Sequence, residues 1–138
     1  CRQGPDCAWH LDVAHNPHAL AALVSQIGTE RRWVAVFGTF RDKRAERMLE
    51  LLEPCVASVH LAPTSGPRGQ SAAALAARLS DVVPSLPRRA HGDIDSALSA
   101  ALLDARRWGH DLLVVGSFTL VAGAERWLDS GYGAAATP

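Results

Sequence analysis

Short apolar runs alternate with segments of helical periodicity along almost the whole chain, and this alternation limits the possible folds more than any other feature. The runs predict strands at residues 9–13, 33–37, 56–61 and 112–115, with a more polar candidate at 88–91. Most of these runs have no polar face, which is typical of strands in a parallel sheet that is covered on both sides.

Helices are expected between the strands, because apolar residues recur there at spacings of three and four and so share one helix face. The predicted helices cover residues 20–27, 45–52, 72–79, 94–105 and about 120–128. Strands and helices that alternate over short loops form βαβ units. We therefore expect residues 1–138 to form one α/β domain, a three-layer Rossmann-like fold with a mostly parallel sheet of five or six strands.

The composition excludes several classes of function. Lys and Arg together number 14, as do Asp and Glu, so the net charge is zero. A broad nucleic-acid or membrane surface would need a basic excess, and no apolar run is long enough to span a bilayer. We therefore expect no nucleic-acid or membrane partner. Three cysteines do not make a disulfide framework, and reduced thiols fit a cytoplasmic protein.

The polar loops that follow the predicted strands should lie together. Parallel strands place all their carboxyl ends at one edge of the sheet, where open α/β sheets bind ligands. Five loops have this position: residues 12–16, 38–43, 63–69, 91–93 and 116–119. A single concave site built from these loops is the default hypothesis.

The loop at residues 12–16 has the densest polar pattern. Asp12 ends an apolar run, and a carboxylate at that place can accept hydrogen bonds from both hydroxyls of a ribose. His15 stands beside the start of a helix, where the helix dipole favours a phosphate or carboxylate ligand. Asn16 and Pro17 suit the N-cap and first positions of that helix, so capping and ligand contact both remain open for them.

A metal site at the same loop is also conceivable from the residue types. His10, Asp12, His15 and His18 are the candidate ligands. However, His15 and His18 lie beyond the strand end, and no second cluster of histidines, cysteines or acids completes a coordination shell. We therefore expect no metal ligands in this chain.

The later loops offer polar groups with two interpretations each. Arg41 and Lys43 could reach an anion over the sheet edge; alternatively, this is a solvated loop in which Asp42 caps the next helix. We expect Arg68 to be a solvated arginine rather than a clamp for a carboxylate. Ser117 offers a hydroxyl either to a ligand or to the start of the last helix.

Two phosphate-binding motifs are absent from the sequence. Gly-x-x-x-x-Gly-Lys-Ser/Thr would mark a loop around a triphosphate, and Gly-x-Gly-x-x-Gly would mark a dinucleotide-binding turn. If the chain handles a nucleotide, we therefore expect another domain to hold its phosphates and Mg²⁺.

Four segments carry a resemblance to a known family. They are residues 11–19 (LDVAHNPHA), 37–43 (FGTFRDK), 62–69 (APTSGPRG) and 115–118 (VGSF). In this order they resemble the C-terminal domain of the folylpolyglutamate synthase family, in particular the bacterial bifunctional dihydrofolate synthase/folylpolyglutamate synthases of the Mur ligase superfamily. The resemblance extends from about residue 9 to residue 128.

The resemblance implies an ATP-dependent ligase of folate biosynthesis and one-carbon metabolism. Such an enzyme phosphorylates a carboxylate of dihydropteroate or of a folate polyglutamate, and the amine of L-glutamate then attacks the acyl phosphate. The resemblance also implies an N-terminal ATPase domain that holds ATP and Mg²⁺, so these 138 residues would be a fragment that lacks it. In that case the domain alone binds no cofactor and is inactive, and the whole enzyme is a cytoplasmic monomer.

Individual roles follow from the same resemblance. Asp12 would contact the ribose of ATP with Asn16 in the same nucleotide-binding group, and His15 would be both nucleotide-binding and catalytic, near the reacting phosphate or the incoming glutamate. The residues expected to bind glutamate are Ser117, Lys43 and Arg41. Two alternatives remain: a stand-alone nucleotide- or amino-acid-binding module without catalysis, and a metal-dependent hydrolase that uses the histidine-rich run.

Overall fold

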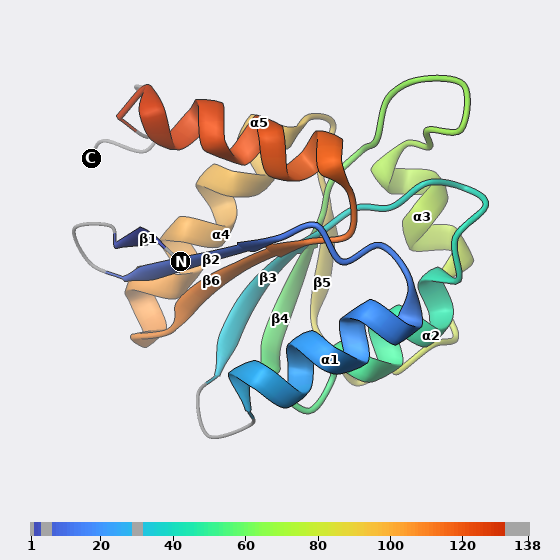
Figure 1. The fold of residues 1–138 in the computed structure, drawn as a ribbon, viewed down its shortest axis with the longest axis horizontal. Helices are drawn as coiled ribbons and strands as arrows, with labels where there is room; N and C mark the ends of the chain where they lie inside the picture. The colour runs from blue at the N-terminus through green and yellow to red at the C-terminus, as the bar shows by residue number, and fades with distance from the viewer. Residues whose placement is uncertain (1, 4–6, 29–31, 132–138) are drawn as a thin grey trace.

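The computed structural model describes residues 2–3, 7–28 and 32–131, which form a six-stranded sheet between two layers of helices (Figure 1). In chain order the strands are β1 (Arg2–Gln3), β2 (Ala8–Asp12), β3 (Trp33–Phe37), β4 (Val56–Leu61), β5 (Arg88–Ala90) and β6 (Asp111–Val115). Across the sheet their order is β1-β2-β6-β3-β4-β5. Strand β1 is antiparallel to β2, and the other described strands are parallel. The prediction of a mostly parallel sheet of five or six strands is confirmed.

Five helices cover the two faces of the sheet in the described part of the chain. They are α1 (Pro17–Ile27), α2 (Ala45–Leu52), α3 (Ala72–Arg78), α4 (Ile94–Trp108) and α5 (Phe118–Asp129). Helices α1, α2 and α3 pack on one face, and α4 and α5 pack on the other. The expected three-layer α/β domain is therefore present.

The central strand β3 shows why two separate cores form. Its five residues are all buried. Ala35 and Phe37 belong to the core beneath α1, α2 and α3, whereas Val34 and Val36 belong to the core beneath α4 and α5. Successive side chains of a strand point to opposite faces, so a run without polar residues can fill both cores at once.

Local hydrogen bonds move some element ends from their predicted positions. Strand β2 ends at Asp12, one residue earlier than expected, because the Asp12 carboxylate accepts the N–H of Ala14 at 2.8 Å and turns the chain. Helix α5 begins earlier than expected because the hydroxyl of Ser117 accepts the N–H of Leu120 and starts the helix. The apolar pattern missed β1, since a two-residue edge strand contains no apolar run.

The cysteines that the structure describes are buried. Cys55 is a free thiol, as the sequence led us to expect, while Cys1 lies outside the described residues. Burial raises the pKa of the Cys55 thiol, which keeps it protonated and poorly reactive. None of the described helices is both long and apolar enough to cross a bilayer.

Candidate functional site

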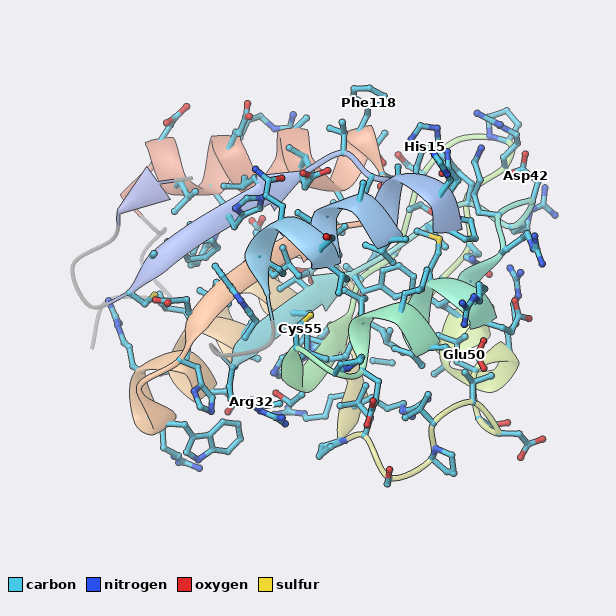
Figure 2. All side chains as sticks on the ribbon, turned by 60° about the horizontal axis from the view of Figure 1, so that its bottom comes forward. His15, Arg32, Asp42, Glu50, Cys55 and Phe118 are labelled. Atoms are coloured by element: carbon cyan, nitrogen blue, oxygen red, sulfur yellow. The ribbon has the colours of Figure 1, made fainter. Side chains whose placement is uncertain are left out.

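The predicted site residues of the first and last loops lie side by side at the carboxyl edge of the sheet. Strands β2 and β6 are parallel neighbours, and Asp12 pairs in register with Val115. The turn from β2 to α1 and the turn from β6 to α5 therefore leave the sheet together. The rings of His15 and Phe118 lie across these turns with centroids 6.3 Å apart, at the same end of the molecule (Figure 2). Asp12, His15 and Ser117 thus share one rim.

Two glycines let the loops at this rim approach one another closely. Gly116 has φ +124°, and a Cβ at this position would lie 2.2 Å from the carbonyl oxygen of Gly38. A Cβ on Gly38 would lie 2.6 Å from the carbonyl oxygen of Ala62. A side chain at either position would push apart the loops that follow β3, β4 and β6. These loops are therefore packed backbone against backbone.

Asp12 has one carboxylate oxygen committed to its own turn and one available. Oδ1 accepts the N–H of Ala14 at 2.8 Å. Oδ2 lies 3.7 Å from Nε2 of His10, which is too long for a direct hydrogen bond. The Asp12 side chain is 32% exposed. A fixed carboxylate whose second oxygen is accessible and forms no direct hydrogen bond with the described residues is suited to accept hydrogen bonds from a ligand diol.

The protonation pattern of His15 follows from its hydrogen bond to the backbone. Its Nδ1 lies 3.1 Å from the carbonyl oxygen of Val13. Since a carbonyl oxygen can only accept, we assign the proton to Nδ1. Nε2 is then an acceptor when the ring is neutral and a donor when the ring is charged. His15 can therefore take a proton or contact an anion through Nε2.

Helix capping explains part of the chemistry of Asn16 and Ser117. The side chain of Asn16 accepts the N–H of Ala19 at 2.8 Å, and Pro17 follows at the start of α1. The Ser117 hydroxyl accepts the N–H of Leu120 at 3.2 Å, and this residue is only 1% exposed. Both helices thus begin at the same rim, where their dipoles favour negative charge. Ligand contact by these two side chains stays a prediction.

The loop after β3 is fastened to the loop after β4. The N–H of Arg41 donates to the carbonyl of Arg68 at 2.9 Å, and the Arg41 guanidinium donates to the carbonyl of Pro67. Arg68 pairs with Asp42 at 3.1 Å and lies 4.9 Å from the ring centre of Phe40. The alternative in which Asp42 caps α2 is therefore wrong, whereas Arg68 is largely exposed, as expected, and pairs with Asp42 at the surface. These two partners are 26 residues apart in sequence.

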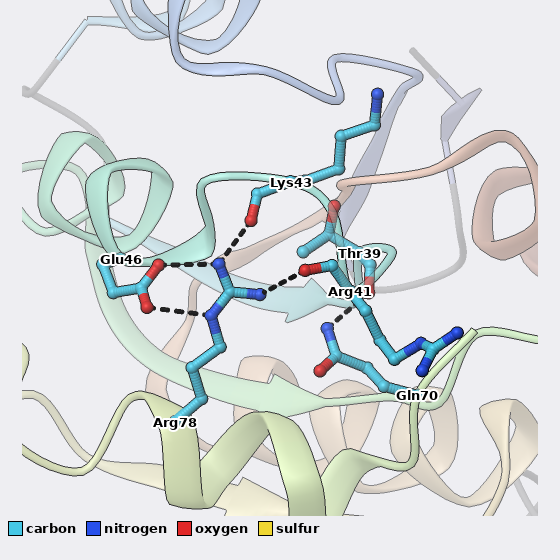
Figure 3. A network of polar contacts seen from close by, with 6 residues as sticks. All are labelled: Thr39, Arg41, Lys43, Glu46, Gln70 and Arg78. Carbon is cyan, nitrogen blue, oxygen red and sulfur yellow. Dashed lines mark hydrogen bonds and ion pairs between the residues drawn. The ribbon is translucent and has the colours of Figure 1, made fainter. Parts of the chain in front are cut away.

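Lys43 differs from the neighbouring arginines in this pair of loops. Its N–H donates to the carbonyl of Phe40 at 3.1 Å, and its own carbonyl accepts from Arg78. Its side chain extends away from the Arg78 guanidinium (Figure 3). Among the residues that the structure describes, no hydrogen bond or ion pair occupies the Lys43 ammonium group. This charge is therefore available to an anionic ligand.

The loop at residues 91–93 belongs to a different part of the surface. Nε2 of His91 lies 2.9 Å from Nδ1 of His60, and Nε2 of His60 lies 2.7 Å from the carboxylate of Asp104. Burial lowers the pKa of His60, although the bond to Asp104 opposes this effect. His91 lines a hollow of about 920 Å³ over α4 that includes neither Asp12 nor His15. The hypothesis that all five loops line one hollow is therefore wrong, because three strands separate β5 from β2.

The histidines of the first loop are not arranged as metal ligands. His10 lies edge-on to the ring of Trp33, with centroids 6.1 Å apart. Over residues 2–3, 7–28 and 32–131, no group of three or more histidine, cysteine, aspartate or glutamate side chains is placed to hold a metal ion. The described residues therefore offer no complete donor set for Mg²⁺.

Several residues that shape the rim were not predicted. Phe118 is 65% exposed and lies against His15; a large apolar residue in the first turn of a helix was the available signal. Gln70 and Arg78 donate to backbone carbonyls of the loop after β3. No local pattern indicates these two contacts, since the partners are 31 to 37 residues apart in sequence.

Comparison with known proteins gives consistent matches. The family model of the Mur ligase, glutamate ligase domain matches residues 2–118. The curated dihydrofolate synthase/folylpolyglutamate synthase of Haemophilus influenzae is 32% identical over 117 residues, which are 81% of this chain and 26% of that protein. The structure of Escherichia coli FolC in complex with DHPP and ADP has a TM-score of 0.73 at 32% identity, over 88% of this chain and 28% of that one.

A bifunctional folylpolyglutamate synthase/dihydrofolate synthase with Mn, AMPPNP and L-glutamate bound has a TM-score of 0.74 at 31% identity, over 94% of this chain and 30% of that one. The chain thus spans about a quarter of the length of the curated relative, 26%. The family match includes the rim from Asp12 to Ser117. The resemblance carried by the four sequence segments is therefore confirmed, and the chain belongs to the Mur ligase family as its glutamate ligase domain.

Proposed function

We propose that this domain forms one wall of an ATP-dependent ligase that joins L-glutamate to dihydropteroate and to folate polyglutamates through an acyl phosphate. The observation that carries the proposal is the rim shared by Asp12, His15 and Ser117 at the ends of β2 and β6. The relatives support the same reaction: the curated protein is named for both synthase activities, and one similar structure holds AMPPNP and L-glutamate.

Asp12 binds the ribose of ATP in this proposal. Its Oδ1 is held by the N–H of Ala14, and its Oδ2 forms no direct hydrogen bond within the described part of the chain. A carboxylate that is fixed before the ligand arrives loses little conformational entropy on binding. Asn16 lies at the start of α1 beside it, so the positive end of that helix dipole faces the nucleotide side of the rim.

His15 acts at the reacting groups. The amine of L-glutamate must lose a proton before its lone pair attacks the acyl phosphate. A neutral His15 with its proton on Nδ1 presents a basic Nε2 for that proton. In its charged form the same nitrogen stabilises the departing phosphate. Contact with Phe118 restricts the ring to the rim.

The carboxylates of L-glutamate are bound by the cationic loop and the α5 turn. Lys43 supplies an ammonium group with no partner among the described residues, and Arg41 supplies the guanidinium N–H groups that Pro67 does not use. Ser117 supplies a hydroxyl at the N-terminus of α5. Charge-assisted hydrogen bonds of this kind are about twice as strong as neutral ones.

The phosphates and Mg²⁺ of ATP are assigned to an N-terminal ATPase domain of the same enzyme. The sequence has no glycine-rich phosphate loop, and the described residues offer no metal site. That domain would hold Mg²⁺, whose chemistry there would be to neutralise phosphate charge. This wall closes the site against water, which would otherwise hydrolyse an acyl phosphate. We expect the whole enzyme to be cytoplasmic and monomeric.

The variant Asp12→Asn tests the ribose contact in the ligase that contains this domain. The amide oxygen can still accept the N–H of Ala14, but the charge and the second acceptor are lost. Loss of about 1.5–3 kcal/mol should raise the KM for ATP by about 10- to 150-fold and leave the KM for L-glutamate unchanged. Asp42→Asn is the matched control, because Asp42 is an exposed aspartate that pairs with Arg68. An unchanged KM for ATP in Asp12→Asn would contradict the ribose role.

A further inference from the structure

One arginine clamps the backbone of the loop that carries Lys43 (Figure 3). The guanidinium of Arg78, on α3, donates to the carbonyl of Arg41 at 3.1 Å and to the carbonyl of Lys43. It also forms a two-bond ion pair with Glu46 on α2, with both bonds at 2.8 Å. One planar group with fixed donors thus makes four hydrogen bonds and ties the loop to two helices.

The same loop is held from a second direction. The side-chain amide of Gln70 donates to the carbonyl of Thr39 at 2.8 Å, and the hydroxyl of Thr64 donates to the same carbonyl at 3.2 Å. The carbonyls of residues 39, 41 and 43 are therefore all bonded to side chains from residues 64–78. Every second peptide group along the loop is fixed from outside the loop.

The cations of this region differ in whether protein groups bind their side chains. Three of its cations are engaged: Arg41 with the Pro67 carbonyl, Arg68 with Asp42, and Arg78 with Glu46. Lys43 alone among these four has an ammonium group without a partner in the described part of the chain. A lysine has a flexible four-carbon stem, so the position of its backbone sets the region that its ammonium group can reach. The carbonyl of Lys43 and the carbonyls of two residues that precede it are the groups that the side chains of Gln70 and Arg78 hold.

We propose that Arg78 is a positioning residue of the ligase: by fixing the carbonyls of Arg41 and Lys43, it aims the Lys43 ammonium at a carboxylate of the incoming L-glutamate. This inference rests on the proposed function, in which Lys43 contacts glutamate. Arg78 does not touch the substrate, and Glu46 pairs with its guanidinium. Helix α3 therefore contributes to glutamate binding without contacting the substrate.

Three variants separate the clamp from the ion pair. Arg78→Met removes both. Arg78→Lys keeps a charge for Glu46, but a single ammonium cannot reproduce the fork that reaches two carbonyls and a carboxylate. Glu46→Gln removes the ion pair and leaves the guanidinium bonds to the loop. We expect both Arg78 variants to raise the KM for L-glutamate about tenfold, and Glu46→Gln to change it less than about threefold.

Arg88→Met is the matched control for a merely structural effect. Arg88 also makes four hydrogen bonds to protein groups next to α3, in this case to the carbonyls of Leu79, Val82, Val83 and Leu86. It therefore stabilises the same region but does not contact the loop after β3. We expect Arg88→Met to lower the stability without changing the KM for L-glutamate. The KM for ATP should stay at the wild-type value in all four variants.

Amide hydrogen exchange measures how firmly Arg78 holds the loop, without depending on ligase activity. The N–H groups of Arg41 and Lys43 are bonded to the carbonyls of Arg68 and Phe40. These two amides should exchange at least about tenfold faster in Arg78→Met than in the wild type, because their loop opens more readily, and not in Arg88→Met. If both amides exchange in Arg78→Met at the same rate as in the wild type, Arg78 does not hold this loop and the inference is wrong.

Two results distinguish the inference from the function on which it rests. If Lys43→Met leaves the KM for L-glutamate unchanged, the proposed glutamate contact fails, whatever the exchange data show. If Lys43→Met raises that KM but Arg78→Met does not, or if Arg88→Met raises it equally, the positioning role of Arg78 is overturned while the proposed function stands. A rise in Lys43→Met, Arg78→Met and Arg78→Lys, with none in Arg88→Met, supports both.

Discussion

Replacing Gly116 by alanine should destabilise the domain far more than the same change at another glycine with positive φ. At Gly116 φ is +124°, and the new Cβ would lie 2.2 Å from the carbonyl oxygen of Gly38. That obstacle is backbone, so it cannot rotate away. Backbone strain of about 1–3 kcal/mol and overpacking of about 1–3 kcal/mol add to a cost of about 2–6 kcal/mol.

Gly109→Ala is the matched control, because Gly109 ends α4 with φ +66° and a Cβ there would meet nothing within 4 Å. Only the left-handed backbone cost of about 1–2 kcal/mol applies to it. Urea unfolding of the 138-residue chain, followed by circular dichroism, would measure both costs. Equal losses in the two variants would refute the close packing of the rim loops. In the ligase, Gly116→Ala should also raise the KM for L-glutamate, since it separates the loops that bear Lys43 and Ser117.

Two further predictions concern acidity and catalysis. The free energy of unfolding should fall as the pH drops from about 7.5 to about 5. Burial lowers the pKa of both His60 and His91, with Arg89 acting in the same direction and Asp104 opposing it. The unfolded chain therefore binds more protons below the ordinary histidine pKa of about 6.5. Urea midpoints should show a flatter pH dependence for His60→Gln, and an unchanged dependence would disprove the assignment. The isolated domain should release no ADP when supplied with ATP, dihydropteroate and L-glutamate. Clear glutamate-dependent turnover would refute this expectation, and nucleotide or glutamate binding without turnover would favour a stand-alone binding module.

Features that depend on neighbouring residues were predictable from the sequence. The alternation of apolar runs with helical spacing predicted the layered α/β fold, and the fully buried strand β3 bears this out. The caps of the helices were also predictable. Asn16, Ser71 and Asp93 each accept the N–H of the residue three positions later, a contact that needs only a short polar side chain at the start of a helix.

The candidate site was predictable only in part. The rim position of Asp12 and His15 followed from the rule that parallel strands end at one edge. Two expectations failed where a distant partner decided the outcome: Asp42 pairs with Arg68 instead of capping α2, and the 91–93 loop faces another hollow. The clamp by Arg78 was also not visible, because an arginine on an exposed helix face gives no sign of what lies opposite it.

The sequence was enough to predict every described strand except β1, the five helices, and the gathering of polar groups at strand ends. These properties follow from hydrophobic periodicity and from hydrogen bonds between residues a few positions apart. The insertion of β6 between β2 and β3 is visible only in the folded chain; it brings Ser117 beside Asp12 and His15 and places β5, with His91 after it, farther from them. Strand order depends on how surfaces that are distant in sequence pack against one another. Patterns among neighbouring residues do not contain that information.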